Sequence, residues 1–336
     1  MKKLQTLLFI CFLTTCSVQA QDIHFSQFFQ SPLLRNPSLA GLFEGDIRVQ
    51  AVYRDQWNSV TNAYKTGSLD AEYKMPVGQA DDFLTVGMQM LYDRAGTIGW
   101  TSTHFLPALN YHKSLSSDRN SYLSLGFMGG FVQRRFDPSK MTTNTQYDGG
   151  GIGESFASPS YSYLDGSVGM SYNASLNDNP ENNFFIGAAY HHFNKPKNSF
   201  YRNPGIQVNP KVVFSGGVRF AVNDYSYVTL LADHSMQNNY KETIAGGMYG
   251  VKLGADPANP DYTIHAGAFL RWNDALVPVI KLDYSPFSVS LSYDVNISPL
   301  KTSSLGRGGM ELSVSFSGFF DRLERSTLNS VLCPRF

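Results

Sequence analysis

Charged side chains are scarce in this sequence. Lys, Arg, Asp and Glu make up 16% of its 336 residues, and the formal net charge is +0. Soluble proteins carry roughly 25% charged residues. A neutral chain offers no electrostatic basis for binding nucleic acid. The composition therefore argues against a nucleic-acid-binding protein and is unusual for a soluble one.

Cysteines and long hydrophobic runs are also scarce. Cys11 and Cys16 lie within an N-terminal signal, so Cys333 would stand alone in the mature chain and no intramolecular disulfide could form. No run after the signal approaches the ~20 apolar residues of a membrane-spanning helix. If the mature chain lies in a membrane, it must cross as strands.

Residues 1–20 are predicted to be a cleaved signal peptide. Two lysines precede an apolar core at residues 7–13, and a small-x-small site ends at Ala20. The core is too short to span a bilayer. The alternative is a lipoprotein signal with an acylated Cys16, but Thr15 is larger than the residue usual before such a cysteine.

Apolar and polar residues alternate through most of the remaining chain. The clearest example is residues 287–316, where two alternating stretches flank a segment rich in Ser and Gly. Alternation gives a strand one apolar and one polar face. One such hairpin also fits a soluble sandwich. However, the pattern recurs about fourteen times between residues 46 and 318, and bacterial barrels have an even number of strands. Pro107 and Pro278 are predicted to begin strands, where a missing N–H costs least.

Loop lengths give a second indication of a barrel. The long connections, residues 134–160, 194–210 and 298–309, all follow odd-numbered strands. The connections after even-numbered strands are short. Outer-membrane barrels have short periplasmic turns and longer extracellular loops. We therefore predict an all-β protein, a transmembrane antiparallel β-barrel of about fourteen strands in the outer membrane.

Two segments flank the predicted barrel of residues 46–318. Residues 21–45 do not alternate, and we expect them to form an N-terminal segment packed on or plugging the barrel. Residues 319–336 follow the last strand and would form a periplasmic C-terminal tail. Such a tail is a candidate for partner contact, and the alternative is a segment that covers an edge or plugs the lumen.

The predicted lumen carries charges of both signs. Isolated buried charges are costly, so in a narrow lumen we expect these groups to pair, which favours a filled interior over an open pore. The inward-facing set is Arg48, Arg54, Asp70, Glu72, Asp93, Arg219, Arg271, Lys281, Asp283, Asp294 and Glu311.

No catalytic, cofactor or metal site is predicted. His191 and His192 are adjacent and would face opposite sides of a strand, and the other histidines lack ligand-like spacing. The glycines at 149–151 and 153 lack the strand-then-helix context of a phosphate loop. No Ser, His and Asp set forms a nucleophile elbow. We expect a protein that is not an enzyme. A barrel lipase or protease is the alternative with the least support.

The segment Gln27–Trp57, QFFQSPLLRNPSLAGLFEGDIRVQAVYRDQW, and the C-terminal sequence CPRF resemble the PorP/SprF family of the type IX secretion system in Bacteroidetes. The resemblance implies a non-enzymatic outer-membrane barrel. It implies as partners either periplasmic lipoproteins of the secretion system or a secreted surface protein, such as a gliding adhesin. A transport barrel for a small solute remains the alternative.

Two groups of residues follow from the resemblance. One is structural, shaping the N-terminal segment or the outer rim of the first strand: Asn36, Pro37, Ala40, Gly41, Tyr53, Arg54, Gln56 and Trp57. The other is a set of candidate partner-binding residues in the tail: Arg322, Arg325, Cys333, Pro334, Arg335 and Phe336.

Overall fold

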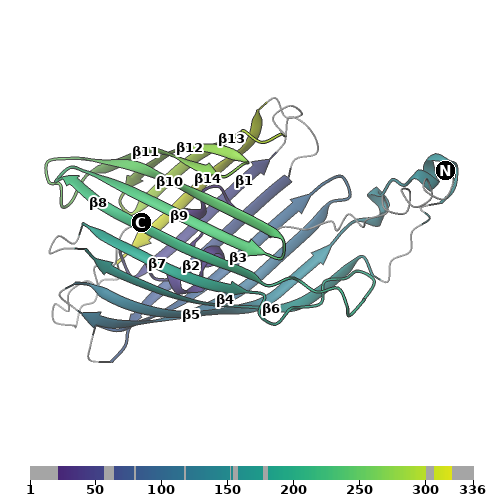
Figure 1. Ribbon diagram of the computed structural model, residues 1–336, viewed down its shortest axis with the longest axis horizontal. Coiled ribbons are helices and arrows are strands. Elements are labelled where there is room, and N and C mark those ends of the chain that lie inside the picture. Colours follow the sequence, from purple (N-terminus) through teal and green to yellow (C-terminus); the bar gives the residue numbers. More distant parts are fainter. Residues whose placement is uncertain are drawn as a thin grey trace, which may run out of the picture.

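A computed structural model describes residues 22–56, 64–78, 81–116, 119–151, 153, 158–176, 181–299 and 306–319. In this part of the chain, fourteen antiparallel strands form one closed barrel (Figure 1). Each strand pairs with its neighbours in sequence, and β1 pairs with β14 from Ile47↔Gly318 to Gln56↔Gly309. No helix among the described residues is long and apolar enough to cross a membrane. The predicted barrel and its strand number are confirmed.

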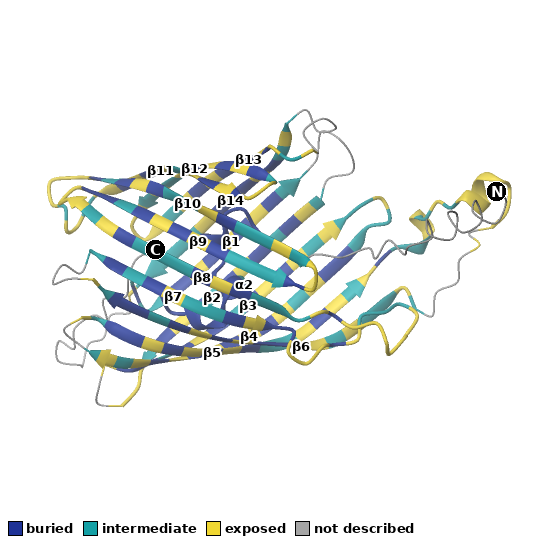
Figure 2. Cartoon of the chain, in the orientation of Figure 1, coloured by how far each residue is buried: buried dark blue, intermediate teal, exposed yellow. Residues whose placement is uncertain are grey.

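The strands follow the alternating segments of the sequence. Buried and exposed residues alternate along each of them (Figure 2). Leu125 and Phe131, both on the outer face, are 61% and 64% exposed, as expected where apolar side chains meet lipid. The strands are β1 (Ile47–Gln56), β2 (Tyr64–Pro76), β3 (Phe83–Ala95), β4 (Trp100–Ser116), β5 (Ser121–Arg135), β6 (Ser160–Ser175), β7 (Asn183–His191), β8 (Lys211–Asn223), β9 (Ser226–Gln237), β10 (Tyr240–Leu253), β11 (Tyr262–Arg271), β12 (Ala275–Tyr284), β13 (Phe287–Asn296) and β14 (Arg307–Gly318).

The two ends of the barrel differ in loop length, as predicted. The long connections follow β5, β7 and β13, and the first of them carries the helices η3 (Pro138–Lys140) and α3 (Asn144–Tyr147). The connections after the even-numbered strands are short; β12 and β13 are joined through Ser285 and Pro286. Because short turns face the periplasm in outer-membrane barrels, the long-loop end is the extracellular end.

The prediction that Pro107 and Pro278 begin strands is wrong. Pro107 lies inside β4 and pairs with Met88 of β3, while its ladder to β5 is interrupted. Pro278 lies inside β12 and pairs with Ala268 of β11, while its ladder to β13 is interrupted. Each proline therefore pairs with a residue of one neighbouring strand and has no paired residue in the other. A proline, which lacks an N–H, is tolerated in a strand at such a position.

The N-terminal segment lies inside the barrel. We call residues 22–46 the plug; it contains η1 (Phe28–Gln30), α2 (Pro32–Arg35) and η2 (Pro37–Leu39) and appears in purple within the ring of strands in Figure 1. Most plug residues are buried and none is exposed, although the segment has no strand of its own. Its short helical turns leave many backbone groups to be satisfied by the barrel wall.

Apolar side chains of the plug meet apolar side chains that face the lumen. Phe28 and Phe29 contact Phe269 of β11 at ring-centroid distances of 5.2 and 5.3 Å. Leu33 packs in a second cluster with residues of β4 and β5, and Phe25 packs in a third with Val52 and Leu91. These contacts stabilise the plug in the lumen because they remove apolar surface from water.

Candidate functional site

The plug runs the length of the lumen. At the extracellular end, the N–H of Asp22 donates to Gln237 Oε1 at 3.3 Å, and its carboxylate lies 2.7 Å from His192 Nε2. At the periplasmic end, the carbonyl oxygen of Asp46 accepts the N–H of Lys74 at 2.8 Å. The described chain therefore begins at the extracellular mouth and enters β1 from the periplasmic end.

Asn36 organises the centre of the plug. Its Oδ1 accepts the N–H of Ser38 at 2.9 Å and the hydroxyl of Ser38 at 2.7 Å, which caps η2. Its Nδ2 donates to the carbonyl oxygen of Met170 in β6 at 3.3 Å. The same side chain thus shapes the turn and attaches it to the wall.

Three inward-facing glycines make room for this turn. A Cβ on Gly126 of β5 would lie 2.4 Å from the carbonyl carbon of Pro37. A Cβ on Gly169 of β6 would lie 1.8 Å from Asn36 Oδ1, and one on Gly187 of β7 would lie 2.8 Å from Asn36 Nδ2. Only glycine fits at these distances, so three neighbouring strands form a seat for the Asn-Pro pair.

Ala40 and Gly41 attach the plug to β2, β3 and β4. Asn110 Nδ2 and His112 Nε2 both donate to the carbonyl oxygen of Ala40 at 2.8 Å. The N–H of Gly41 donates to Glu72 Oε2 at 2.7 Å. Gly41 has φ +86°, and a Cβ there would lie 2.2 Å from Thr85 Oγ1, so both conformation and space require glycine.

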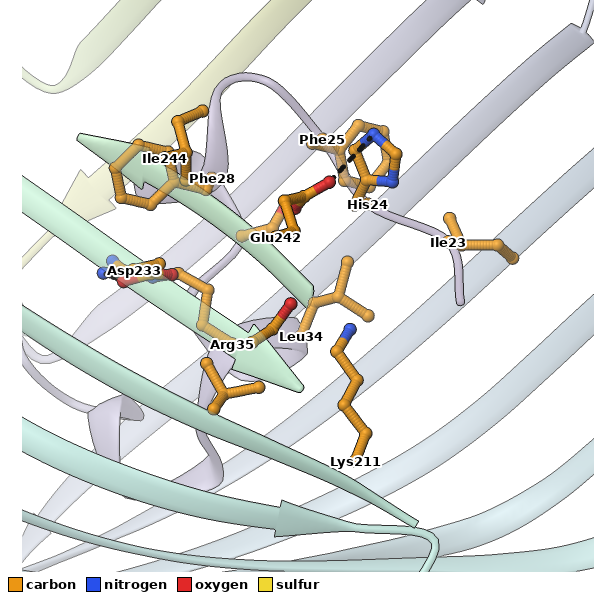
Figure 3. A pocket seen from close by; sticks show the side chains of 13 residues that line it. Ile23, His24, Phe25, Phe28, Leu34, Arg35, Lys211, Asp233, Glu242 and Ile244 are labelled. Atoms are coloured by element: carbon orange, nitrogen blue, oxygen red, sulfur yellow. Dashed lines mark hydrogen bonds and ion pairs between the residues drawn. The ribbon is translucent and has the colours of Figure 1, made fainter. Parts of the chain in front are cut away.

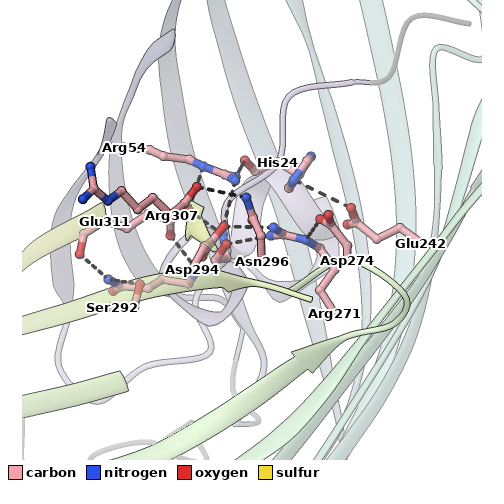
Figure 4. A network of polar contacts seen from close by, with 12 residues as sticks. His24, Arg54, Glu242, Arg271, Asp274, Ser292, Asp294, Asn296, Arg307 and Glu311 are labelled. Carbon is pink, nitrogen blue, oxygen red and sulfur yellow. Dashed lines mark hydrogen bonds and ion pairs between the residues drawn. The ribbon is translucent and has the colours of Figure 1, made fainter. Parts of the chain in front are cut away.

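Arg54 is the centre of a buried ionic network near the extracellular end (Figure 4). Its guanidinium lies 3.1 Å from Asp294 and 3.3 Å from Glu311, and it donates to the carbonyl oxygen of His24 at 2.8 Å. Asp294 also accepts from Arg271 at 2.9 Å. The network therefore joins β1, β11, β13 and β14 with the plug.

Glu311 of β14 holds the plug backbone directly. Its two carboxylate oxygens accept the N–H groups of Ser26 and Gln27, both at 2.7 Å. The side chain of Gln27 returns a hydrogen bond to the carbonyl oxygen of Glu311 at 2.9 Å. Charge-assisted hydrogen bonds in a buried site are strong, so this carboxylate is a main attachment point of the plug.

The other inward charges are also paired or hydrogen-bonded, as predicted for a filled lumen. Arg48 lies 2.6 Å from Glu72, and Lys281 lies 3.1 Å from Asp283. The plug residue Arg35 forms a bidentate pair with Asp233 of β9 and lies 4.8 Å above the ring of Phe28. Asp70 and Asp93 accept hydrogen bonds from Ser68 and Thr66, respectively.

His192 links the start of the plug to the wall. Its Nδ1 lies 2.7 Å from Asp165 of β6 and its Nε2 lies 2.7 Å from Asp22. Burial alone would lower the pKa of His192, but the two carboxylates outweigh it and raise the pKa to about 10. Burial raises the pKa of Asp22, yet the imidazolium outweighs this effect and holds that pKa below its ordinary value.

The expectation that His191 and His192 face opposite sides of a strand is wrong. β7 ends at His191, and His192 has φ +56°, so both side chains are buried on the lumen side. His191 Nε2 donates to the carbonyl oxygen of Arg35 at 3.1 Å. Among the described residues, no group of three His, Cys, Asp or Glu is placed to hold a metal ion.

The plug separates two cavities. The extracellular cavity measures about 870 Å³ and is lined by charged and aromatic side chains, including Arg54, Trp100 and Glu242. The periplasmic cavity measures about 450 Å³ and includes Arg48 and Lys281. The described plug lies between them, so neither cavity is a continuous channel.

A smaller hollow of about 50 Å³ lies between the plug and β8 to β10 (Figure 3). His24 faces Glu242 there at 3.7 Å. Burial lowers the pKa of His24 to about 4 despite this carboxylate, so the imidazole is neutral near pH 7. The remaining lining mixes apolar side chains with polar and charged ones such as Arg35, Lys211 and Asp233, and the hollow is too small for a ligand larger than a few water molecules.

The residues predicted to lie at the outer rim of the first strand face different sides of the barrel wall. Tyr53 is 43% exposed on the outer surface, Arg54 is buried in the lumen, and Gln56 lines the extracellular cavity. Trp57 lies outside the described residues. So do the candidate partner-binding residues Arg322, Arg325, Cys333, Pro334, Arg335 and Phe336, and the predicted signal peptide.

Comparison with known families agrees with this architecture. A family model described as type IX secretion system membrane protein PorP/SprF matches residues 17–316. The chain belongs to the PorP/SprF family. No curated protein matches this PorP/SprF protein. Membership and the barrel together place it in the outer membrane.

Solved structures similar to this PorP/SprF protein are also barrels. The CymD monoaromatic hydrocarbon channel is 9% identical, with 87% of this chain and 94% of that chain covered and a TM-score of 0.50. The P. putida toluene transporter TodX is 11% identical, with the same coverages and a TM-score of 0.49. Omp33 of Acinetobacter baumannii is 8% identical, with 82% and 99% covered and a TM-score of 0.42. At such identities the likeness concerns the fold alone.

Proposed function

We propose that this PorP/SprF protein is a non-catalytic barrel that supports the export or surface attachment of a partner protein by the type IX secretion system. Family membership over residues 17–316 carries the proposal. The plugged lumen supports it further. Glu311 and Arg54 hold the plug backbone through buried charge-assisted hydrogen bonds, and Asp233 forms an ion pair with Arg35 of the plug. The barrel therefore offers partners its two ends and not an open channel.

Co-purification tests this proposal. The protein is extracted from native membranes in mild detergent, and the proteins retained with it are compared with those retained by an unrelated outer-membrane barrel of similar size. We expect type IX secretion components, such as periplasmic lipoproteins, or one secreted surface protein, such as a gliding adhesin. Recovery of the same proteins with both barrels would contradict the proposal.

The tail at residues 319–336 is the proposed periplasmic contact. β14 ends at Gly318, at the end of the barrel with the short turns, so the chain leaves the wall on the periplasmic side. Truncation of residues 321–336 should leave the barrel folded and weaken the association with periplasmic partners. Equal recovery of those partners by the truncated and full-length proteins would rule out this role for the tail.

Transport of a small solute is the second candidate, and the two cavities of about 870 and 450 Å³ favour it. It requires the plug to move, because the plug separates the cavities. Reconstitution into liposomes distinguishes the candidates. A secretion partner with a fixed plug shows no solute uptake, whereas a transporter shows uptake that heat-unfolded protein does not give.

A further inference from the structure

The barrel wall has an open edge near the extracellular end. β6 begins at Ser160, but its pairing with β7 begins only at Ser167, opposite His191. Residues 160–166 therefore pair with β5 on one side, from Ser160↔Arg135 to Gly166↔Gly129, and with no described strand on the other. β8 resumes the wall at Lys211, which pairs with His191.

The loop after β7 does not continue the wall. Asn198 accepts a hydrogen bond from Arg134 at 2.8 Å and contacts the hydroxyl of Tyr161, while Phe200 packs among Trp100, Phe136 and Tyr161. Arg134 and Tyr161 occupy inward-facing positions of their strands. These contacts hold the middle of the loop over the mouth of the lumen.

Two contacts of the loop reach the lower part of this edge. The N–H of Phe193 donates to the carbonyl oxygen of Gly166 at 3.2 Å, and Asn194 Nδ2 donates to that of Leu164 at 2.7 Å. They also show which backbone groups face the gap. In an antiparallel sheet, every second residue of a strand directs both its N–H and its C=O to the same neighbouring strand. Ser162 therefore directs both groups toward the gap. Ser160 faces the same side, but its N–H donates to Ser158 Oγ at 3.3 Å and its carbonyl oxygen accepts the Ser158 hydroxyl at 2.6 Å.

The side chains that commonly protect an edge against strand addition are absent from residues 160–164, although the loop covers the lower part of the edge. Exposed edges are commonly blunted by Lys, Pro or a bulge. Residues 160–164 read SYSYL, with no charge and no proline, and the carboxylate of Asp165 is turned inward to His192. Tyr and Ser side chains on alternate faces also suit an extended neighbour.

We propose that residues 161–165 of β6 form a docking edge that takes up an extended segment of the exported partner as an additional strand. This inference rests on the proposed function and names the chemistry of its partner. Main-chain hydrogen bonds to the edge would supply affinity, and side-chain contacts would supply specificity. On the inward face the segment meets Tyr161 and Tyr163, whose rings stack at 6.2 Å, so it carries apolar or aromatic residues at alternate positions.

Site-specific photo-crosslinking tests the docking edge. A photoreactive residue replaces Ser162 in the full-length protein in its native cells, and Thr103 serves as the matched control. Thr103 is exposed on the outer face, as Ser162 is. It lies at the same height in the wall, because both residues pair with Gln133 of β5. Unlike Ser162, Thr103 has a paired strand on each side. We expect crosslinks from position 162, and not from 103, to an extended segment of the protein whose export requires this barrel.

Two substitutions provide a functional readout. Ser162→Pro removes an N–H that faces the gap and leaves the pairing with β5, and Ser162→Lys blunts the edge; Thr103→Lys is the control. Loss of one hydrogen bond predicts about fivefold weaker retention of the partner for S162P. Heat-dependent gel mobility confirms that each variant is folded, and S162K keeps the test valid should S162P not fold.

The outcomes are distinct. Wild-type retention of the partner by folded S162P and S162K would overturn the docking edge, as would crosslinks only to this chain's own residues or to a second copy. If the docking edge is overturned but deletion of the whole protein abolishes export of the partner, the proposed function holds and only the docking edge is wrong. If that deletion changes nothing, the proposed function itself fails.

Discussion

Asn36 occupies the space that a Cβ on Gly169 would need, since its Oδ1 lies 1.8 Å from that position. One residue belongs to the plug and the other to the middle of β6. The fit shows that the barrel wall is built around the plug. A glycine in a strand interior weakens the strand unless another backbone or side chain must approach closely, and Asn36 is that group here.

Gly169→Ala should displace the plug. The added methyl group cannot coexist with the Asn36 side chain, so the turn at Asn36-Pro37 must move away from β6. We expect faster protease cleavage within residues 22–46 of the detergent-solubilised protein, with the barrel itself still folded.

Gly87→Ala is the matched control for this substitution. Gly87 also faces the lumen and the plug, but a Cβ there would lie 3.5 Å from Leu33 Cδ1 and 3.4 Å from the Ala108 Cβ, which are ordinary contacts. G87A should be cleaved at the wild-type rate. Equal cleavage of G169A and G87A would contradict the tight seat.

Glu311→Ala should destabilise the protein strongly. It removes the acceptor of two plug N–H groups and a partner of the buried Arg54 guanidinium. Removal of one partner from a buried ion pair costs about 3–5 kcal/mol. Glu311→Gln keeps the shape and a carbonyl acceptor, so its loss should be smaller. Equilibrium unfolding in denaturant measures both, and a wild-type stability of E311A would refute this role.

The attachment of Asp22 to His192 should depend on pH. The pKa of His192 is raised from 6.5 to about 10, so its contribution is complete below pH 6.5 and is lost as the pH rises through about 10. The pKa of Asp22 is lowered, so its contribution is lost as the pH falls below the ordinary 3.8. A spin label on Ile23→Cys, in a Cys333→Ser background, should become mobile at both extremes.

His192→Gln is the control for the pH dependence. It removes the imidazolium that holds Asp22, so the label should already be mobile between these limits and should show no further change as the pH rises through about 10. In the protein that retains His192, a label whose mobility does not change as the pH rises above about 10 would contradict the ionic attachment.

The start of the plug should be reachable from outside the cell. Asp22 lies at the long-loop end of the barrel, and the predicted cleavage after Ala20 would leave one residue before it. An epitope placed directly before Asp22 should bind antibody on intact cells. The same epitope at the exposed Gly78, in the turn between β2 and β3, should bind only after permeabilisation. The reverse pattern would contradict the orientation.

The barrel was predictable from sequence because alternation and loop length are local properties. Phe287–Asn296 shows its two faces without reference to any other strand. The path of the plug depends on contacts between residues far apart in the sequence. Asn36 bonds to Met170, for example, and no spacing in the sequence predicts that contact. Breaks in the alternation were the available signal. Leu91 and Phe269, apolar at inward positions, are residues on which the plug packs.

The central claim is that this plugged barrel serves a partner protein of the type IX secretion system. Quantitative proteomics of the culture medium and cell surface, with the gene deleted and then restored, tests it most directly. We predict that deletion removes one specific secreted or attached protein and that restoration returns it. Unchanged amounts of every secreted and surface protein after deletion would contradict the claim.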